Sequence, residues 1–355
     1  MLSNENLQTK CNRMKAVFLI IDYVPHQENT IKKLIEKTDC EVLAFHAALF
    51  DKSIPEIKKF ETYQYNQFTK EDILKKIKKF QPDFIVTAGW MIKEFIWVCK
   101  QITKDGKIPV VAQSDTPWYG KITQKINSAI SPFHLSKAFT HLWVAGYQQY
   151  EYARKLGFAN NKILMNSLSA DVRHFSKVNI ENKKLEYPRN LLYIGRFSEE
   201  KGIKILLNAW EEIKDKKSWK LVFVGKGDLK SEIDKCNDVV IKDYMNQKDL
   251  LLEMQNSGAF VLSSISESWG LVLHEAASAG LPIICTDVCG ASPHFVINNY
   301  NGYKVKPDTT LLKNAIEKLI SKTDEELMNF SYNSRILGNS ITQDTSIANL
   351  LQVIS

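Results

Sequence analysis

Short apolar runs alternate along the chain with segments whose apolar residues recur at three- and four-residue spacing. Runs rich in β-branched and aromatic residues are typical of buried strands, and the wider spacing is typical of helices. In the first half, we expect strands at residues 16–21, 41–44, 84–88, 109–113 and 142–145, and helices at 29–37, 70–80 and 147–156. This alternation predicts a parallel sheet covered by helices.

The second half repeats the pattern after a polar stretch rich in Lys, Asn and Glu. Strands are expected at 191–194, 221–224, 259–262 and 282–286, and helices at 203–213, 249–256, 271–279 and 310–320. The fold class is therefore α/β, with two doubly wound Rossmann-like domains facing a central cleft. The predicted parts are an N-terminal domain (1–175), a linker (176–189), a C-terminal domain (190–335) and a C-terminal helical segment (336–355) that would pack back on the N-terminal domain.

Composition agrees with a soluble chain that has two cores. The 355 residues are 25% charged and 44% hydrophobic, which excludes intrinsic disorder and collagen. No apolar run approaches the ~20 residues of a membrane-spanning helix. The opening residues lack the basic-then-apolar pattern of a secretory signal, so we expect a cytoplasmic protein.

Several kinds of site are excluded by missing motifs. The P-loop, HExxH and G-x-S-x-G patterns are absent, and Gly225-Lys-Gly227 lacks the third glycine of a dinucleotide fingerprint. Cys285 and Cys289 have no second pair to complete a zinc site, so we expect six ordinary reduced thiols. Since no Asp-x-Asp pair occurs, we expect no metal, and a bound diphosphate would need basic side chains and helix amides.

A loop with both signs of charge follows the strand at 191–194. It begins at Gly195, where the chain can turn, and places Arg196 and Lys201 five residues apart. A planar guanidinium and a compact ammonium together suit two phosphate groups. The alternative is a solvated loop whose cations bind nothing.

A second loop joins a buried strand to the predicted helix at 271–279. The amides around Gly270 and Leu271 at the helix start form a ready anion site. Glu267 precedes this start, where an acid is also an ordinary capping residue, and Glu275 lies on the order of 12 Å further along. Because Glu275 stands among apolar residues, its carboxylate needs hydrogen-bond donors such as ribose hydroxyls.

These loops carry a family resemblance. The second half resembles the retaining family-4 glycosyltransferases of the GT-B fold through LLYIGRFSEEKGIKILLNAW, LVFVGKGD, FVLSSISESWGLVLHEAASAGLPIICTD and CGASPHFVINNYNGYKV, and the Glu267-x7-Glu275 pair matches that family's signature. The resemblance implies that the C-terminal domain binds a nucleotide sugar and the N-terminal domain its acceptor. It further implies that Glu267 contacts the donor sugar, that residues 243–245 lie near the base, and that the donor-binding residues are Gly195, Arg196, Lys201, Ser266, Trp269, Gly270, Leu271 and Glu275.

The acceptor side matches the family less well. Residues 22–26 read Asp-Tyr-Val-Pro-His where family members commonly have a glycine-rich loop. Asp115 follows the strand at 109–113 and is the candidate to orient or deprotonate the acceptor hydroxyl. It could equally be a turn-starting Asp before Thr-Pro. His26 is the second candidate for a catalytic role.

Charge is unevenly distributed between the two halves. Residues 1–180 contain 26 Lys and Arg against 17 Asp and Glu, whereas residues 181–355 contain 21 against 23. Lys75, Lys76, Lys78 and Lys79 on one predicted helix, and Lys121 and Lys125 beside Trp118 and Tyr119, would suit an anionic membrane surface. Solvated sheet-covering helices explain the same lysines, and no Arg stripe supports nucleic-acid binding.

The sequence thus favours a metal-independent, cofactor-free hexosyltransferase that retains the anomeric configuration. Its donor would be a nucleotide-diphosphate sugar, UDP- rather than GDP-linked, and its acceptor a glycan or glycolipid hydroxyl. We expect a lipid-linked intermediate of cell-surface polysaccharide or lipopolysaccharide synthesis, used by a cytoplasmic protein that contacts the inner face of the cytoplasmic membrane. The alternatives are a GT-B sugar-nucleotide 2-epimerase and a non-catalytic sugar-nucleotide-binding subunit.

Overall fold

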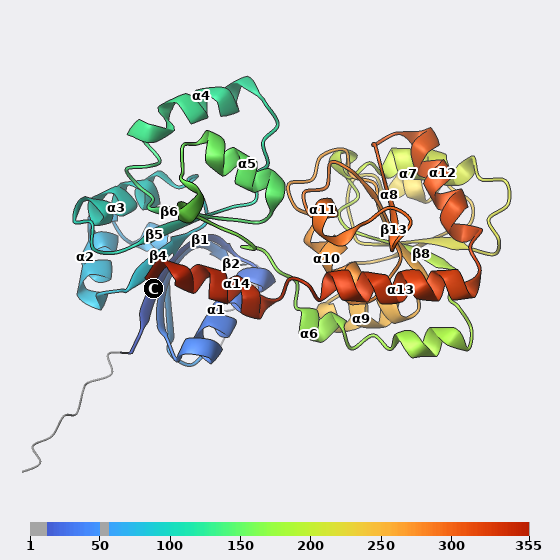
Figure 1. The fold of residues 1–355 in the computed structure, drawn as a ribbon, viewed down its shortest axis with the longest axis horizontal. Coiled ribbons are helices and arrows are strands. Elements are labelled where there is room, and N and C mark those ends of the chain that lie inside the picture. Colours follow the sequence, from blue (N-terminus) through green and yellow to red (C-terminus); the bar gives the residue numbers. More distant parts are fainter. Residues whose placement is uncertain (1–12, 50–56, 355) are drawn as a thin grey trace, which may run out of the picture. The chain divides into compact units, whose positions relative to one another are not determined.

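The computed structural model describes residues 13–49 and 57–354 (Figure 1). It divides into two compact units. The first contains the described residues of Met1–Gln113 together with Ile130–Leu142 and Leu351–Ser355, and the second contains Ser114–Ala129 and Trp143–Leu350. The domain boundaries expected from the sequence stay predictions. The polar opening segment and Cys11 lie outside the described residues.

The first sheet has the order β3-β2-β1-β4-β5-β6-β7 (Figure 1). The chain starts at β1 in the middle, builds outward to one edge, and then crosses back to β4, which pairs with β1 in parallel. The strands are β1 (Lys15–Tyr23), β2 (Glu41–Leu49), β3 (Phe60–Gln64), β4 (Phe84–Thr87), β5 (Val110–Ser114), β6 (His141–Val144) and β7 (Ile163–Leu164).

Helices connect these strands. They are α1 (Pro25–Thr38), α2 (Lys70–Phe80), α3 (Lys93–Lys104), α4 (Ile122–Ile130), α5 (Tyr147–Lys155) and α6 (Val172–Phe175), with 3₁₀ turns η1 (Tyr65–Gln67), η2 (Ser131–Phe133), η3 (Asn160–Lys162) and η4 (Ile180–Lys184). Helix α2 has the predicted bounds because Thr69 and Asp72 form a reciprocal cap at its start. Its apolar stripe is buried at Ile73 and Ile77, as the spacing predicted.

The second sheet is fully parallel, in the order β10-β9-β8-β11-β12-β13. Its strands are β8 (Asn190–Ile194), β9 (Lys220–Val224), β10 (Val239–Lys242), β11 (Ala259–Leu262), β12 (Ile283–Thr286) and β13 (Gly302–Val305). The accompanying helices and turns are η5 (Glu199–Lys201), α7 (Ile203–Glu211), α8 (Lys230–Ile233), α9 (Gln247–Gln255), α10 (Leu271–Ser278), α11 (Ser292–Phe295), α12 (Thr309–Ile320), α13 (Asp324–Gly338), α14 (Gln343–Leu351) and η6 (Gln352–Ile354).

The two sheets confirm the predicted fold class of two doubly wound Rossmann-like domains. In the second sheet, the chain reverses its winding direction between β8 and β11, which are neighbours. The loops that follow these two strands therefore diverge to opposite faces, and ligands of such sheets bind where this happens. Buried residues of β8, β11 and α10 form one core with the surrounding helices.

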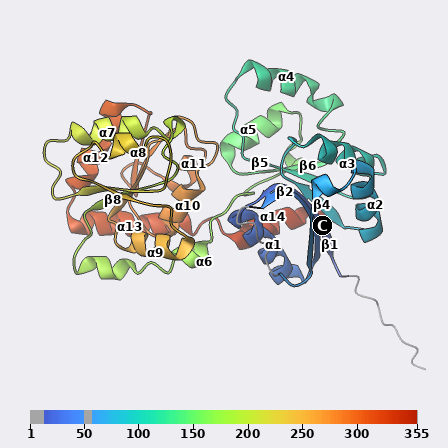
Figure 2. The same cartoon turned by 180° about the vertical axis from the view of Figure 1, so that it is seen from behind.

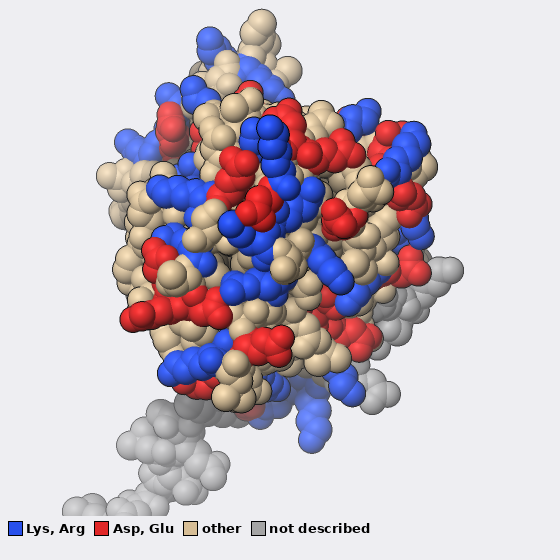
Figure 3. Space-filling model, turned by 90° about the vertical axis from the view of Figure 1, so that its right-hand side faces the viewer, with Lys and Arg blue, Asp and Glu red and all other residues tan. Residues whose placement is uncertain are grey.

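The surface beside α7 and α12 carries both signs of charge without a large area of either (Figure 3). This agrees with the near balance of acidic and basic residues in 181–355. Among the described residues, no helix combines the length and the apolar character needed to cross a bilayer.

Burial in the second core predicts how substitutions affect stability. Leu206 of α7 is fully buried and Leu311 of α12 is 42% exposed. Leu206→Ala should lower the free energy of unfolding by about 2–5 kcal/mol, whereas Leu311→Ala should change it by about 0.5 kcal/mol or less. Urea denaturation measures both, and equal effects would contradict the packing described.

Candidate active site

The candidate site lies where β8 and β11 end, at the reversal point of the second sheet. Residues 195–202 follow β8 and residues 263–270 follow β11. Ser263 Oγ donates to the carbonyl of Lys201 (3.0 Å), and the amide of Ile265 donates to the carbonyl of Glu200 (2.9 Å). The two loops predicted to bind a diphosphate are therefore bonded to each other.

Gly202 makes this close approach possible. Its φ is +65°, and a Cβ at this position would lie 2.0 Å from the carbonyl oxygen of Ser263. Any other residue would push the two loops apart, because backbone atoms cannot shift as a flexible side chain can. The glycine thus sets the position of Lys201, its neighbour in the chain.

An ion pair joins Lys201 to Glu267 across the two loops. The Lys201 ammonium contacts Oε2 of Glu267, and the two side chains are only 20% and 13% exposed. Ser264 Oγ donates to the same carboxylate oxygen (3.2 Å). Two of the residues singled out from the sequence are thus in direct contact, and both are held in place by their neighbours.

Helix α10 begins at Leu271, four residues after Glu267. Gly270 is its N-cap with φ +85°, and a Cβ there would lie 3.1 Å from Cγ of Glu267. The first amides of a helix have no partner within the helix and attract anions. The start of α10 therefore lies beside Glu267 and has the dipole that suits an anionic ligand.

Glu275 lies on α10, among residues that are mostly buried. Desolvation and, second to it, the charge of the nearby Asp171 together raise the pKa of its carboxyl to about 7. Within the described residues, no cation or hydrogen-bond donor accounts for this carboxyl. A ligand that brings hydroxyl donors would stabilise it, as expected from the sequence.

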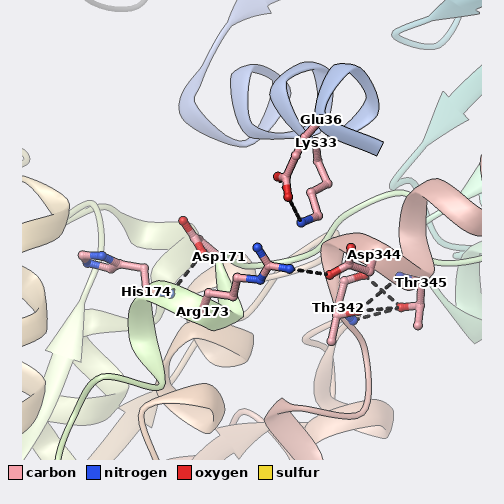
Figure 4. A network of polar contacts seen from close by, with 8 residues as sticks. All are labelled: Lys33, Glu36, Asp171, Arg173, His174, Thr342, Asp344 and Thr345. Atoms are coloured by element: carbon pink, nitrogen blue, oxygen red, sulfur yellow. Dashed lines mark hydrogen bonds and ion pairs between the residues drawn. The ribbon is translucent and has the colours of Figure 1, made fainter. Parts of the chain in front are cut away.

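Asp171 is fixed at the start of α6. Its side chain accepts from the amide of His174 (3.1 Å; Figure 4), and the His174 ring lies 3.0 Å from the carbonyl of Gln247. The neighbouring Arg173 bonds Asp344 at 3.4 Å. Asp171 therefore has little freedom to move away from Glu275, and it was not singled out in the sequence.

Asp115 lies within electrostatic range of Glu267. Desolvation raises the pKa of the Asp115 carboxyl, and the charge of Glu267 adds to the rise. Gln149 holds this region together, because its Nε2 donates to the carbonyls of Ser268 (2.7 Å) and Asp115 (3.0 Å). The structure thus brings together two residues that are 152 positions apart in the sequence.

An aromatic cluster packs against Trp269 of the loop at residues 263–270. The ring of Trp269 is buried against His294 and Phe295, and His294 stacks on Tyr147 with ring centroids 4.2 Å apart. Burial lowers the pKa of His294 to about 4, so its ring is neutral at pH 7. The Trp269 side chain faces the core of the second unit. Its contact with the donor stays a prediction.

The remaining predicted residues occupy varied surroundings. Gly195 follows β8, and Arg196 is 71% exposed with its guanidinium 3.8 Å from Glu200. Ser266 is exposed and donates its amide to the carbonyl of Glu200 (3.2 Å). His26 lies in α1 of the first unit, where desolvation lowers its pKa to about 4.

The loop after β10 was predicted to lie near the nucleotide base. Tyr244 is 61% exposed, and the Lys226 ammonium lies 5.9 Å from its ring centroid. The adjacent Asp243 contacts Lys230 at 3.7 Å. An exposed ring at the carboxyl end of a strand suits stacking on a base.

Neither a metal site nor a disulfide is found in the described part of the chain. No group of three or more His, Cys, Asp or Glu there is arranged to hold a metal ion. The described cysteines, at positions 40, 99, 236, 285 and 289, are free thiols.

Comparisons with known proteins point to glycosyltransferases. Residues 176–336 match the family model of glycosyl transferases group 1. The chain is 34% identical over 146 residues to the putative teichuronic acid biosynthesis glycosyltransferase TuaC of Bacillus subtilis. This match covers 39% of this chain and 33% of TuaC. It is 25% identical over 231 residues to the N,N'-diacetylbacillosaminyl-diphospho-undecaprenol alpha-1,3-N-acetylgalactosaminyltransferase of Campylobacter jejuni, covering 61% of this chain and 60% of that protein.

These matches span less than two thirds of each relative's length. Similarity of structure extends further. Anabaena Alr3699/HepE in complex with UDP superposes with a TM-score of 0.75 at 16% identity, covering 96% of this chain and 99% of that one. This likeness, with the two parallel sheets, shows that the fold is GT-B.

The raised pKa of Glu275 predicts a pH-dependent stability. Its folded value of about 7 lies above the usual 4.5, so the folded state holds a proton that the unfolded chain releases. Ionisation therefore works against folding as the pH rises through this window. The side chain in Glu275→Gln cannot ionise. Its free energy of unfolding relative to wild type should therefore rise by up to about 3 kcal/mol from about pH 5 to pH 8.

Urea denaturation at the two pH values measures this difference. Glu325→Gln, at an exposed position of α13, is the control for loss of a charge. Parallel pH dependence of Glu275→Gln and wild type would show that the carboxyl is not desolvated.

Proposed function

We propose that this protein is a retaining glycosyltransferase that transfers a sugar from a UDP-sugar to a hydroxyl of a glycan acceptor in cell-surface polysaccharide synthesis. The observation that carries the proposal is the Lys201–Glu267 pair at the start of α10. It combines a cation for phosphate, a carboxylate for sugar hydroxyls and a helix N-terminus in one place. The match to group 1 glycosyltransferases over residues 176–336 supports it.

On the donor side, the leaving group is a nucleoside diphosphate. Negative charge grows on its β-phosphate as the bond to the sugar breaks, and groups aimed at that charge lower the barrier. Lys201, Arg196 and the first amides of α10 are the proposed groups. Arg196 is exposed and only loosely paired with Glu200, so it is free to turn toward a phosphate.

The proposed ribose contact is Glu275. Its carboxyl is desolvated, and among residues 13–49 and 57–354 the charged group that affects it is the acidic Asp171. Two ribose hydroxyls would supply donors to the ionised form and lower its pKa. Donor binding is therefore expected to release a proton near neutral pH.

On the acceptor side, the proposed general base is Asp115. The side chain is exposed, yet desolvation and then the charge of the neighbouring Glu267 raise the pKa of its carboxyl, which makes the carboxylate a stronger base. His26, the other candidate, belongs to the first unit. In the proposed same-face attack, the acceptor hydroxyl approaches on the side that the diphosphate leaves, gives its one proton to Asp115, and bonds to the anomeric carbon as the bond to the diphosphate breaks, which would retain the anomeric configuration.

Two relatives guide the choice of substrates. HepE is described in complexes with UDP and with UDP-glucose, and the Campylobacter protein is named for an acceptor on diphospho-undecaprenol. We therefore include a UDP-linked donor and a lipid-linked acceptor in the proposal. Release of an epimerised sugar nucleotide from donor alone would instead identify a 2-epimerase.

Removing the cations should weaken binding of UDP. Arg196→Ala and Lys201→Ala each delete a charge-assisted contact and should raise the Kd for UDP by about 10- to 100-fold. Isothermal titration with UDP and GDP measures this and tests the preference for uridine. Lys204→Ala is the matched control, because Lys204 is an exposed lysine of α7 paired with Glu199.

The proposal fails on the donor side if UDP binds all three variants alike. A Kd unchanged in Lys204→Ala but raised in the other two would locate the diphosphate at the reversal point of the second sheet.

Removing the proposed base should slow transfer without weakening donor binding. Asp115→Asn should lower kcat by about 10²- to 10⁴-fold, with the Kd for UDP changed about twofold or less, because the residue is assigned to the acceptor. UDP release from UDP-sugars, supplied with polyprenyl-diphosphate-linked sugars, measures kcat. Full activity of Asp115→Asn would exclude the role, and product NMR would show whether the anomeric configuration is retained.

A further inference from the structure

Helix α4 turns its apolar stripe toward solvent. Ile122, Ile126 and Ile130 follow one another at four-residue spacing and are 75%, 54% and 47% exposed. The opposite face is anchored by Gln124, which is buried, accepts from the amide of Tyr119 (2.8 Å) and donates to the carbonyl of Pro117 (2.8 Å). Polar bonds thus hold the helix in place, and its isoleucines are left uncovered.

Flanking residues enlarge this apolar surface. Phe133 in η2, directly after the helix, is 75% exposed, and Tyr119 just before it is 42% exposed. In Figures 1 and 2, α4 lies beside α5. We call this set the α4 surface: Tyr119, Ile122, Ile126, Ile130 and Phe133. Contiguous exposed apolar side chains of this kind mark a docking surface.

The segment that carries the α4 surface, between Asp115 and Glu151, has charges of one sign. Residues 116–150 contain three lysines, Lys121, Lys125 and Lys137, and no Asp or Glu. All three lysines are exposed, and the Lys121 ammonium lies 5.1 Å from the ring centroid of Tyr119. The occupant that fits such a surface is both apolar and anionic.

We propose that the α4 surface docks onto an anionic lipid bilayer, with the helix lying in the plane of the headgroups. The isoleucines and Phe133 would enter the acyl boundary, while the lysines meet lipid phosphates and Tyr119 sits at headgroup level. Each lysine near such a surface adds attraction that salt weakens. The proposal does not depend on glycosyl transfer.

Lysine content alone does not make such a surface. Helix α2 has four lysines within two turns, but Ile73 and Ile77 are buried, and Lys76 lies over the rings of Tyr63 and Phe68. It covers the first sheet and offers no apolar stripe to a membrane. Of the two segments whose lysines suggested lipid contact, only the one at 118–125 adjoins exposed isoleucines.

Charge also argues against a second copy as occupant. A symmetric dimer would place identical surfaces together, so the lysines of both copies would meet with no acid from residues 116–150 between them. An acidic lipid surface has the complementary charge.

The test compares vesicles of equimolar phosphatidylglycerol and phosphatidylcholine with vesicles of phosphatidylcholine alone. The wild-type chain should co-sediment with the anionic vesicles, and added salt should weaken binding. Ile122→Glu/Ile126→Glu should lower the partition coefficient at least about 10-fold, because burial of the isoleucines is lost. Both positions are exposed, so circular dichroism should show an unchanged fold.

A matched pair of charge reversals separates local docking from overall attraction. Lys121→Glu/Lys125→Glu should lower binding to the anionic vesicles, whereas Lys75→Glu/Lys79→Glu in α2, with the same change of net charge, should leave most of it. Equal losses, or full binding by Ile122→Glu/Ile126→Glu, would overturn the proposal. So would a wild-type dimer that these isoleucine substitutions dissociate.

Binding of UDP provides an independent readout on the same variants. The Kd for UDP should be unchanged in Ile122→Glu/Ile126→Glu, because the substituted side chains project into solvent. Failure to bind vesicles would therefore leave the proposed donor site standing, and failure to bind UDP would leave the membrane surface standing.

Discussion

The partly buried ion pair between Lys201 and Glu267 is the interaction on which the candidate site depends. Its two partners come from loops after β8 and β11, which are adjacent only because the sheet reverses its winding there. Removing one partner would leave the other charge poorly solvated. Glu267 neutralises the lysine that we assign to a phosphate. A donor diphosphate would provide a second anion for Lys201 and free part of the carboxylate for sugar hydroxyls.

Two pairs of acidic groups lie close together in the second unit. Asp115 lies close enough to Glu267 to be affected by its charge, and Asp171 stands in the same relation to Glu275. In both cases desolvation and a like charge favour the protonated acid. Hydroxyl groups of a sugar nucleotide would donate to these carboxyls, which is the role that the proposed function gives them.

The sequence predicted those parts of the fold that have strong local signals. Helix α2 has a capping box and β11 a buried apolar run, and both have the expected bounds. Strand β3 was missed because its residues are only partly buried, so its composition is mixed. Helices α3 and α4 were also missed. Helix α3 lacks a side-chain cap and contains aromatic and β-branched residues, which are also common in strands. Helix α4 has exposed isoleucines, contrary to the usual pattern of buried apolar residues.

The same distinction applies to the site. Gly195, Arg196, Lys201, Glu267 and Glu275 stood out because their types are unusual in short motifs beside predicted strands. Asp171 and Gln149 carry no such local signal, since their importance comes from partners about 100 or more positions away. Only the three-dimensional structure identifies them.

The most direct measurement is a crystal structure with an intact UDP-sugar. The account predicts phosphate oxygens within about 3 Å of the Lys201 ammonium and of the first amides of α10, with ribose hydroxyls on Glu275. A nucleotide bound elsewhere, with the Lys201–Glu267 pair undisturbed and Glu275 without a ligand contact, would contradict it.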